Sequence, residues 1–212
     1  MNNYILIFLS IFLSACYQNE QKIQQEQVLV SCNCKDLITV YANTHLLPRD
    51  VQSSYANEDK EEVVKTQRWL YETISENLVL AEGIPYSGRR FNLDSLLNRT
   101  GYPKTEIEKL TSYAQNYEVS FRYIIEGQKE VYGMENDSLS NLQRDIAKKY
   151  YSSGTLPETF YQLNDERSKV SADYAQKICV LHCQPVAIIV GELHLEWFRK
   201  NGYKVAYPPR NL

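Results

Sequence analysis

Glycine, proline and histidine are scarce in this sequence, and basic residues do not outnumber acidic ones. With 8 Gly and 7 Pro among 212 residues, the chain is neither collagen-like nor of low complexity. The formal net charge is -3, with 23 Lys and Arg against 26 Asp and Glu, which argues against a broad basic surface, so we expect no nucleic-acid partner. Glycine-rich phosphate loops and Gly-x-Ser-x-Gly elbows are absent, which makes kinases and serine hydrolases poor candidates. Because there are only 3 His, a histidine at the end of a strand is informative.

The segment 1–15 contains no Lys, Arg, Asp or Glu. Its apolar run, Tyr4–Ala15, would be about 18 Å long as a helix, too short for a hydrocarbon core of about 30 Å but typical of a secretory signal peptide. The run ends in Leu13-Ser-Ala-Cys16, which resembles the bacterial lipobox. An ordinary secretory signal followed by a chance cysteine is the alternative.

The lipobox resemblance implies a lipoprotein signal peptide at 1–15 and acylation of Cys16, which would anchor the protein to a membrane. Tyr17, where an Asp would favour the inner membrane, resembles an outer-membrane address. We therefore expect a lipid-anchored protein of the bacterial cell envelope, on the outer membrane and facing the periplasm. The polar, Gln-rich segment 16–27 is predicted to be a tether, because it has too few apolar side chains to offset the entropy cost of ordering. The remaining 28–212 is predicted to be a single domain.

Four cysteines follow the tether, namely Cys32, Cys34, Cys179 and Cys183. Disulfides persist in exported proteins, and the second pair lies four residues apart on a predicted helix, so that both thiols share one face. We expect disulfides between the first pair and the second, with the connectivity open. A zinc site that uses these cysteines with His182 is the alternative.

Short apolar runs alternate with helical patterns along the domain. Strands are predicted at 37–42, 78–81, 130–133 and 186–190, with a last short one at 203–206. Helices are predicted at 57–77, 93–98, 104–126, 139–151, 157–182 and 193–201. This alternation predicts an α/β fold, with a small, mostly parallel sheet of about four to five strands wrapped by helices.

Histidine or glutamate follows each of the four main strands. His45 comes after the first, Glu82 after the second, Glu135 after the third, and Glu192 and His194 after the fourth. The carboxyl ends of parallel strands meet at one edge of the sheet, where ligands bind in such folds. We therefore expect these side chains to converge in one pocket, although each alone is equally typical of a solvated or capping residue.

Several of these segments together resemble the TraB/Tiki superfamily, which includes erythromycin-esterase-like and ChaN-like haem-binding lipoproteins. The similarity covers about residues 37 to 207. One departure is Ala42, where the first Gly-x-x-His motif of the family has glycine. The segments that carry the resemblance are Val40–His45, Leu78–Gly83, Tyr132–Glu135, Asp165–Arg167, Val186–His194 and Asn201–Val205.

The resemblance implies a hydrolase, dependent on a divalent metal in parts of the superfamily, that acts on a small-molecule or peptide ligand. Two imidazoles and a carboxylate form a known ligand set for zinc, and manganese is the other candidate. A metal-bound water would then be the nucleophile. Glu82 is expected as a third ligand or general base, and Arg167 is expected to steady a carboxylate or an oxyanion. The expected metal ligands are His45, His194 and Glu192, and the expected catalytic residues are Glu82, Glu135 and Arg167.

Two other functions stay open. One is a haem- or iron-binding lipoprotein, in which one of the 17 Tyr, for example Tyr86, Tyr123 or Tyr132, would supply an axial ligand, and the sequence does not mark one tyrosine above the others. The other is a binding protein of the cell envelope that keeps the sheet without the chemistry.

Overall fold

The folded unit comprises Cys34–Leu212, and a computed structural model describes residues 33–44, 57–150 and 155–209 of the chain. The expected signal peptide, the tether and the start of the domain at residue 28 lie outside the described residues, as do Cys16, Cys32 and His45. Within the described ranges, no helix is long and apolar enough to cross a membrane.

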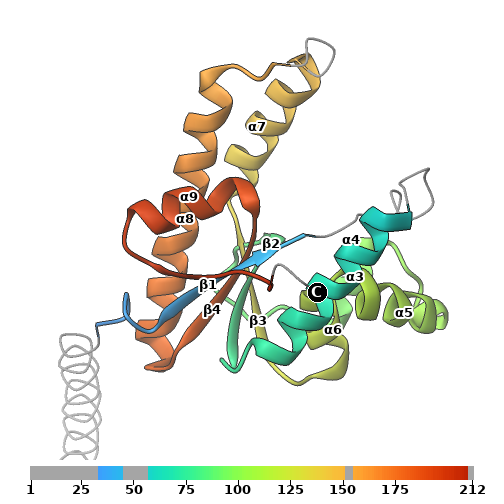
Figure 1. Ribbon diagram of the computed structural model, residues 1–212. Helices are drawn as coiled ribbons and strands as arrows, with labels where there is room; N and C mark the ends of the chain where they lie inside the picture. Colours follow the sequence, from blue (N-terminus) through green and yellow to red (C-terminus); the bar gives the residue numbers. More distant parts are fainter. Residues whose placement is uncertain (1–32, 45–56, 151–154, 210–212) are drawn as a thin grey trace, which may run out of the picture. The chain divides into compact units, whose positions relative to one another are not determined.

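Five parallel strands form one sheet in the order β3-β2-β4-β1-β5 (Figure 1). The central strands are continuous runs of buried residues, as expected where helices cover both faces of a parallel sheet. The predicted α/β class with a small, mostly parallel sheet is confirmed. The strands are β1 (Ile38–Asn43), β2 (Leu78–Pro85), β3 (Glu130–Glu135), β4 (Val186–Gly191) and β5 (Lys204–Ala206).

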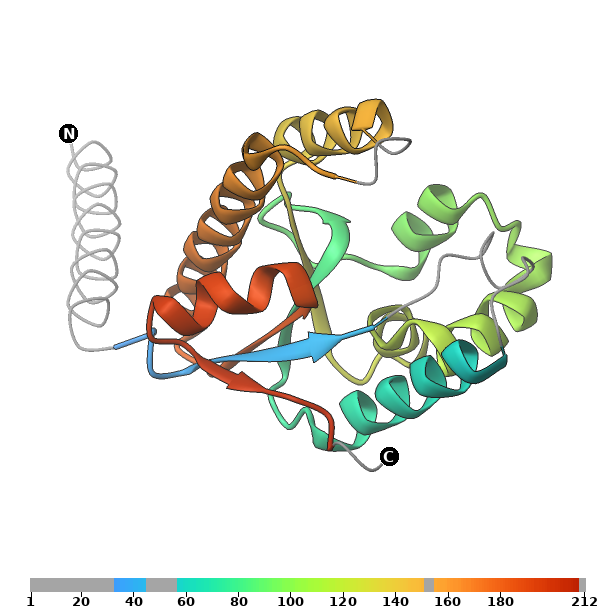
Figure 2. The ribbon, with the colours of Figure 1, turned by 45° about the horizontal axis from the view of Figure 1, so that its top comes forward.

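Helices cover the two faces of the sheet differently (Figure 2). One face packs against an apolar cluster supplied by α3 (Asn57–Thr73), α4 (Leu93–Thr100), α5 (Ile107–Tyr117) and α6 (Val119–Glu126). The other face packs against α8 (Glu158–His182) and α9 (Glu192–Lys200), and α7 (Asp137–Tyr150) packs against α8.

The single helix predicted over 104–126 is wrong. The structure has a short 3₁₀ turn, η1 (Lys104–Glu106), then α5 and α6, which are separated at Glu118. The side chain of Gln67 on α3 stabilises this break, because its Oε1 accepts a hydrogen bond from the backbone N–H of Val119 at 2.7 Å. A long-range contact of this kind satisfies one of the orphan donors at a helix start and has no local signal in the sequence.

Strand β2 bulges against β3 just before the carboxyl edge, with a register shift between Ala81 and Pro85. Gly133 on β3 permits this close approach, because a Cβ there would lie 2.0 Å from the carbonyl oxygen of Pro85. The bulge places Glu82 and the next residue, Gly83, at the sheet edge beside the end of β3.

Cys34 and Cys179 are joined as a disulfide, with Cα atoms 5.9 Å apart. This pairing connects the segment before β1 to the buried face of α8, in line with one of the pairings expected between the two groups of cysteines. Cys183 is exposed at the end of α8, and Cys32 lies outside the described residues.

Candidate functional site

Glu82 is held at the carboxyl edge by the neighbouring strand. Its Oε2 accepts a hydrogen bond of 2.6 Å from the backbone N–H of Gly191, the last residue of β4. A Cβ at Gly191 would lie 3.3 Å from this oxygen, so the absence of a side chain lets the carboxylate approach the backbone. The glycine of the Gly191-x-x-His194 motif therefore binds the carboxylate of Glu82, which lies on a different strand.

His194 lies in the first turn of α9 and is buried behind Glu82. Its Nε2 is 3.4 Å from Oε1 of Glu82, and its Nδ1 is 2.8 Å from Oγ of Ser168 on α8. The main chain of the same turn is tied to α8, because Nδ2 of Asn164 donates to the carbonyl oxygen of Leu193 at 2.7 Å. Both ring nitrogens of the histidine therefore have polar neighbours, and its ring orientation is set by α8.

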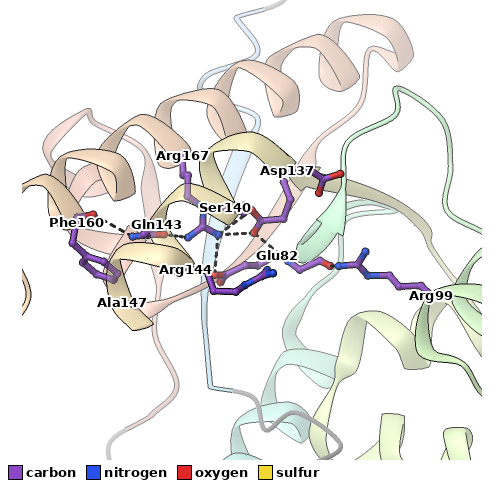
Figure 3. Close-up of a pocket in the computed structure, with 11 residues that line it drawn as sticks. Glu82, Arg99, Asp137, Ser140, Gln143, Arg144, Ala147, Phe160 and Arg167 are labelled. Atoms are coloured by element: carbon purple, nitrogen blue, oxygen red, sulfur yellow. Dashed lines mark hydrogen bonds and ion pairs between the residues drawn. The ribbon is translucent and has the colours of Figure 1, made fainter. Parts of the chain in front are cut away.

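Glu135 ends β3 and pairs with Arg167 of α8. Nη2 of Arg167 lies 2.7 and 2.9 Å from the two carboxylate oxygens of Glu135 and 3.6 Å from Oε1 of Glu82. Glu135 also accepts hydrogen bonds from the backbone N–H of Gly83, at 3.2 Å, and from the hydroxyl of Ser140. One guanidinium thus bridges the two carboxylates. Figure 3 shows Arg167 beside Ser140 and Glu82.

Helix α7 lies beside the carboxylate of Glu135, because the helix begins only two residues later, at Asp137. Oδ1 of Asn136 caps the helix by accepting from the backbone N–H of Leu139 at 3.2 Å, which turns the chain sharply after Glu135. The first turn then presents Ser140 to Glu135, and the second presents Gln143, whose Oε1 accepts from Nη1 of Arg167.

These side chains line a cavity of about 250 Å³. Glu82 is 19% exposed at its wall, whereas the side chains of Glu135 and His194 are 7% and 2% exposed. Glu82 is therefore the carboxylate of the group with the greater access to solvent. The other wall residues are polar or charged for the most part, with Phe160 and Ala147 as the apolar exceptions among the side chains.

The structure brings together four residues singled out by the sequence: Glu82, Glu135, Arg167 and His194. It does not bring Glu192 to them. Glu192 is exposed and lines a second cavity, of about 710 Å³, with Asn43 and Thr44 at the end of β1. His45, the other expected metal ligand, lies outside the described residues.

The positive charge between the two carboxylates of this site comes from an arginine. The guanidinium of Arg167 already lies between the carboxylates of Glu82 and Glu135, where a cation bound by both would have to sit. Among residues 33–44, 57–150 and 155–209, no three His, Cys, Asp or Glu side chains are grouped to hold a metal ion. This also applies to the zinc alternative at Cys179 and His182, since Cys179 is in the disulfide and Nε2 of His182 lies 3.0 Å from the hydroxyl of Tyr132.

The three tyrosines named as possible haem ligands are not among the residues that line this cavity. Tyr123 is buried in the apolar cluster, and Tyr86 stacks on Tyr174 with ring centroids 3.6 Å apart. Burial raises the pKa of Tyr132 to about 12, helped by its hydrogen bond to Glu130. Burial also raises the pKa of Tyr86 and of Tyr123.

Several residues of the site were missed in the sequence. On α8 a signal was present, because the missed Asn164, Ser168 and Ser171 share one helix face with the predicted Arg167, at the i, i+3, i+4, i+7 spacing. Asn164, Ser168 and Ser171 are buried, so the face that an ordinary amphipathic helix would fill with apolar residues is polar here. Ser140 and Gln143 had no comparable signal. Helix α7 is largely exposed, so polar side chains are expected along it and these two do not stand out.

Comparison of the chain with family models, with curated proteins and with solved structures found no match. The class defined by fold and site is thus a parallel α/β domain with a His–Glu–Arg cluster at the carboxyl edge of its sheet. The TraB/Tiki resemblance stays a prediction.

Proposed function

We propose that this protein is a hydrolase of small substrates and that Glu82 is its general base. The observation that supports the proposal is the junction of Glu82, Arg167 and His194, which come from three separate elements. Glu82 and Arg167 line the cavity, and His194 lies behind Glu82. Carboxylate, imidazole and guanidinium are the groups that remove a proton from water and stabilise a developing oxyanion.

The difference in exposure assigns the roles. Glu82 reaches the cavity, so it takes the proton from a water molecule there, while the backbone N–H of Gly191 fixes its second oxygen. His194 is 1% exposed and cannot touch a substrate. It positions Glu82 from behind, with its Nε2 3.4 Å from Oε1 of that carboxylate.

Arg167 lines the cavity and is shared between Glu135 and Glu82. Its Nε is buried and has no hydrogen-bond partner among the described residues, a cost that folding alone does not require. Burying a paired charge is often neutral or unfavourable compared with well-packed apolar side chains. A buried ion cluster at a cavity wall therefore favours a chemical role over a stabilising one, and Glu135 acts by holding the guanidinium.

A hydrolysis screen tests the proposal. The full chain, purified without chelator, is assayed on a panel of p-nitrophenyl esters and acyl-amino-acid p-nitroanilides. Glu82→Gln is expected to lower kcat/KM by about 10²- to 10⁴-fold, as for loss of a general base, with an unchanged Tm. Glu192→Gln, at the second cavity, is the matched control and should leave the rate unchanged.

Equal rates for Glu82→Gln and the wild type would contradict the assignment, and a wild type inactive on the whole panel would favour a binding protein instead. The metal content of the same preparation tests the cofactor separately. Because Arg167 supplies the cation between the carboxylates, we expect the activity to survive dialysis against a chelator. Activity lost to the chelator and restored by zinc or manganese would instead support the metal-dependent hydrolase that the TraB/Tiki resemblance implies.

We further propose that the domain is lipid-anchored in the cell envelope, and the Leu13–Cys16 junction supports this. Cys16→Ser should release the protein from the membrane fraction and abolish the mass shift of acylation. Ser10→Ala, in the same apolar run, is the control and should leave both unchanged. Unaltered membrane partitioning of Cys16→Ser would overturn the proposal.

A further inference from the structure

We infer that Arg99 and Arg144 form an anion subsite in this cavity, so that the substrate carries a carboxylate or a phosphate group. The inference rests on the proposed function in taking this cavity as the place where substrate binds. It goes further by naming the chemical class of that substrate.

The two arginines come from different helices on either side of the cavity. Arg99 lies in the last turn of α4 and Arg144 in the middle of α7, and both line its wall (Figure 3). Nη2 of Arg99 donates a hydrogen bond to the carbonyl oxygen of Gly83, the residue after Glu82. This bond fixes one guanidinium beside the proposed general base and leaves its other N–H groups for a ligand.

Neither guanidinium forms an ion pair with any carboxylate of the described residues. Arg144 has one weak neutral partner, Oδ1 of Asn141 at 3.3 Å, and Arg99 has the Gly83 carbonyl. Arg167, in contrast, is paired with Glu135 at 2.7 Å. The wall carries three arginines and three acids, the third acid being Asp137. Two of the acids, Glu82 and Glu135, share Arg167. Arg99 and Arg144 are therefore the arginines that can turn to an anion, with five donors each in the fork that fits carboxylate and phosphate oxygens.

The cavity also limits the size and polarity of the substrate. At about 250 Å³ it lies just below the range of about 300–1,000 Å³ typical of small-molecule sites. Its apolar side chains are Phe160 and Ala147. A long acyl chain would therefore find few apolar side chains to contact and would bury polar groups of the wall without hydrogen-bond partners. A compact acid, such as an acylated amino acid, fits the volume and can pair with the arginines.

Equilibrium binding of small probes to the full chain tests the subsite. The probes are N-acetylglycine, its uncharged analogue N-acetylglycinamide, and inorganic phosphate, measured by calorimetry at low ionic strength. We expect at least one anion to bind about tenfold or more tightly than N-acetylglycinamide, and Arg99→Gln and Arg144→Gln each to weaken it about tenfold, the effect of losing one charge-assisted hydrogen bond. Arg68→Gln, an exposed arginine of α3 outside the cavity, is the control.

Each outcome decides a separate point. Binding of N-acetylglycine alone assigns a carboxylate substrate, and binding of phosphate alone assigns a phosphate substrate. Equal affinity for the acid and the amide, or equal effects of Arg68→Gln and the two cavity variants, would overturn the subsite. Glu82→Gln should keep the anion affinity while losing hydrolysis. Anion binding in a chain that hydrolyses nothing would leave the subsite standing and overturn the proposed function.

Discussion

The two faces of the sheet are built on different principles. On the face covered by α3 to α6, the core is almost wholly apolar and aromatic, from Leu70 and Ile74 to Tyr123. On the face covered by α8, buried polar side chains run along the helix, among them Asn164 and Ser168. The first face is made of groups that gain free energy by leaving water, and the second of groups that need partners to leave it.

We therefore expect the apolar face to contribute most of the stability and the polar face to carry the candidate site. Burial of apolar area stabilises by about 25 cal/mol per Å², whereas a buried ion cluster is close to neutral against apolar packing. The face that carries the candidate site is also the face with the disulfide between Cys34 and Cys179.

Removal of that link is expected to give the largest loss of stability. The double variant Cys34→Ser/Cys179→Ser should lower the free energy of unfolding by about 4–5 kcal/mol, because the bond spans 145 residues of chain. Urea unfolding with and without reductant measures it. The wild type should be weakened by reductant and the double variant should not, and a wild type insensitive to reductant would contradict the disulfide.

Loss of one partner of the ion cluster comes next. Arg167→Met leaves Glu135 almost fully buried without its guanidinium and should destabilise the fold by about 3–5 kcal/mol. The double variant Arg167→Met/Glu135→Leu should recover most of this loss while staying inactive. A double variant as unstable as the single one would show that the cluster is needed for folding.

A cavity in the apolar face should cost somewhat less and leave the site intact. Leu70 on α3 is fully buried, so Leu70→Ala is expected to destabilise by about 2–5 kcal/mol. Anion affinity and turnover per folded molecule should match the wild type, as measured below the unfolding transition. Val64→Ala, half-buried on the same helix, is the control for a smaller loss. Altered turnover in Leu70→Ala would mean that the two faces are coupled.

Gly191→Ala should change stability least and activity sharply. The backbone at Gly191, with φ -66° and ψ 163°, is open to alanine, so the cost should be about 1 kcal/mol from crowding alone. The new Cβ at 3.3 Å would displace Oε2 of Glu82, and a shift of this kind lowers kcat by up to about 100-fold. Leu193→Ala, exposed two residues on, is the control. Full activity in Gly191→Ala would remove Gly191 from the site.

Much of the fold was open to prediction because it depends on local periodicity. The apolar runs that became β1, β2, β3 and β4 were each located within a few residues, and their alternation with helices implied a parallel sheet. The end of a parallel strand also indicates which edge a residue reaches, so Glu82, Glu135 and His194 could be placed near one another. The break at Glu118 could not be predicted, since it depends on Gln67, which is remote in sequence.

The sequence by itself determined the α/β class, the edge of the sheet at which charged residues gather, and the polar stripe along α8, because helix and strand periods are written in neighbouring residues. Only the tertiary structure decided the pairings: Arg167 lies between two carboxylates, Gly191 serves Glu82, and Glu192 turns to another cavity. Those contacts depend on the order of the strands and on the bulge of β2. A different strand order or a different bulge would give each of these side chains another neighbour. Distances of a few ångströms decide whether two charges pair, and no spacing along the chain specifies them.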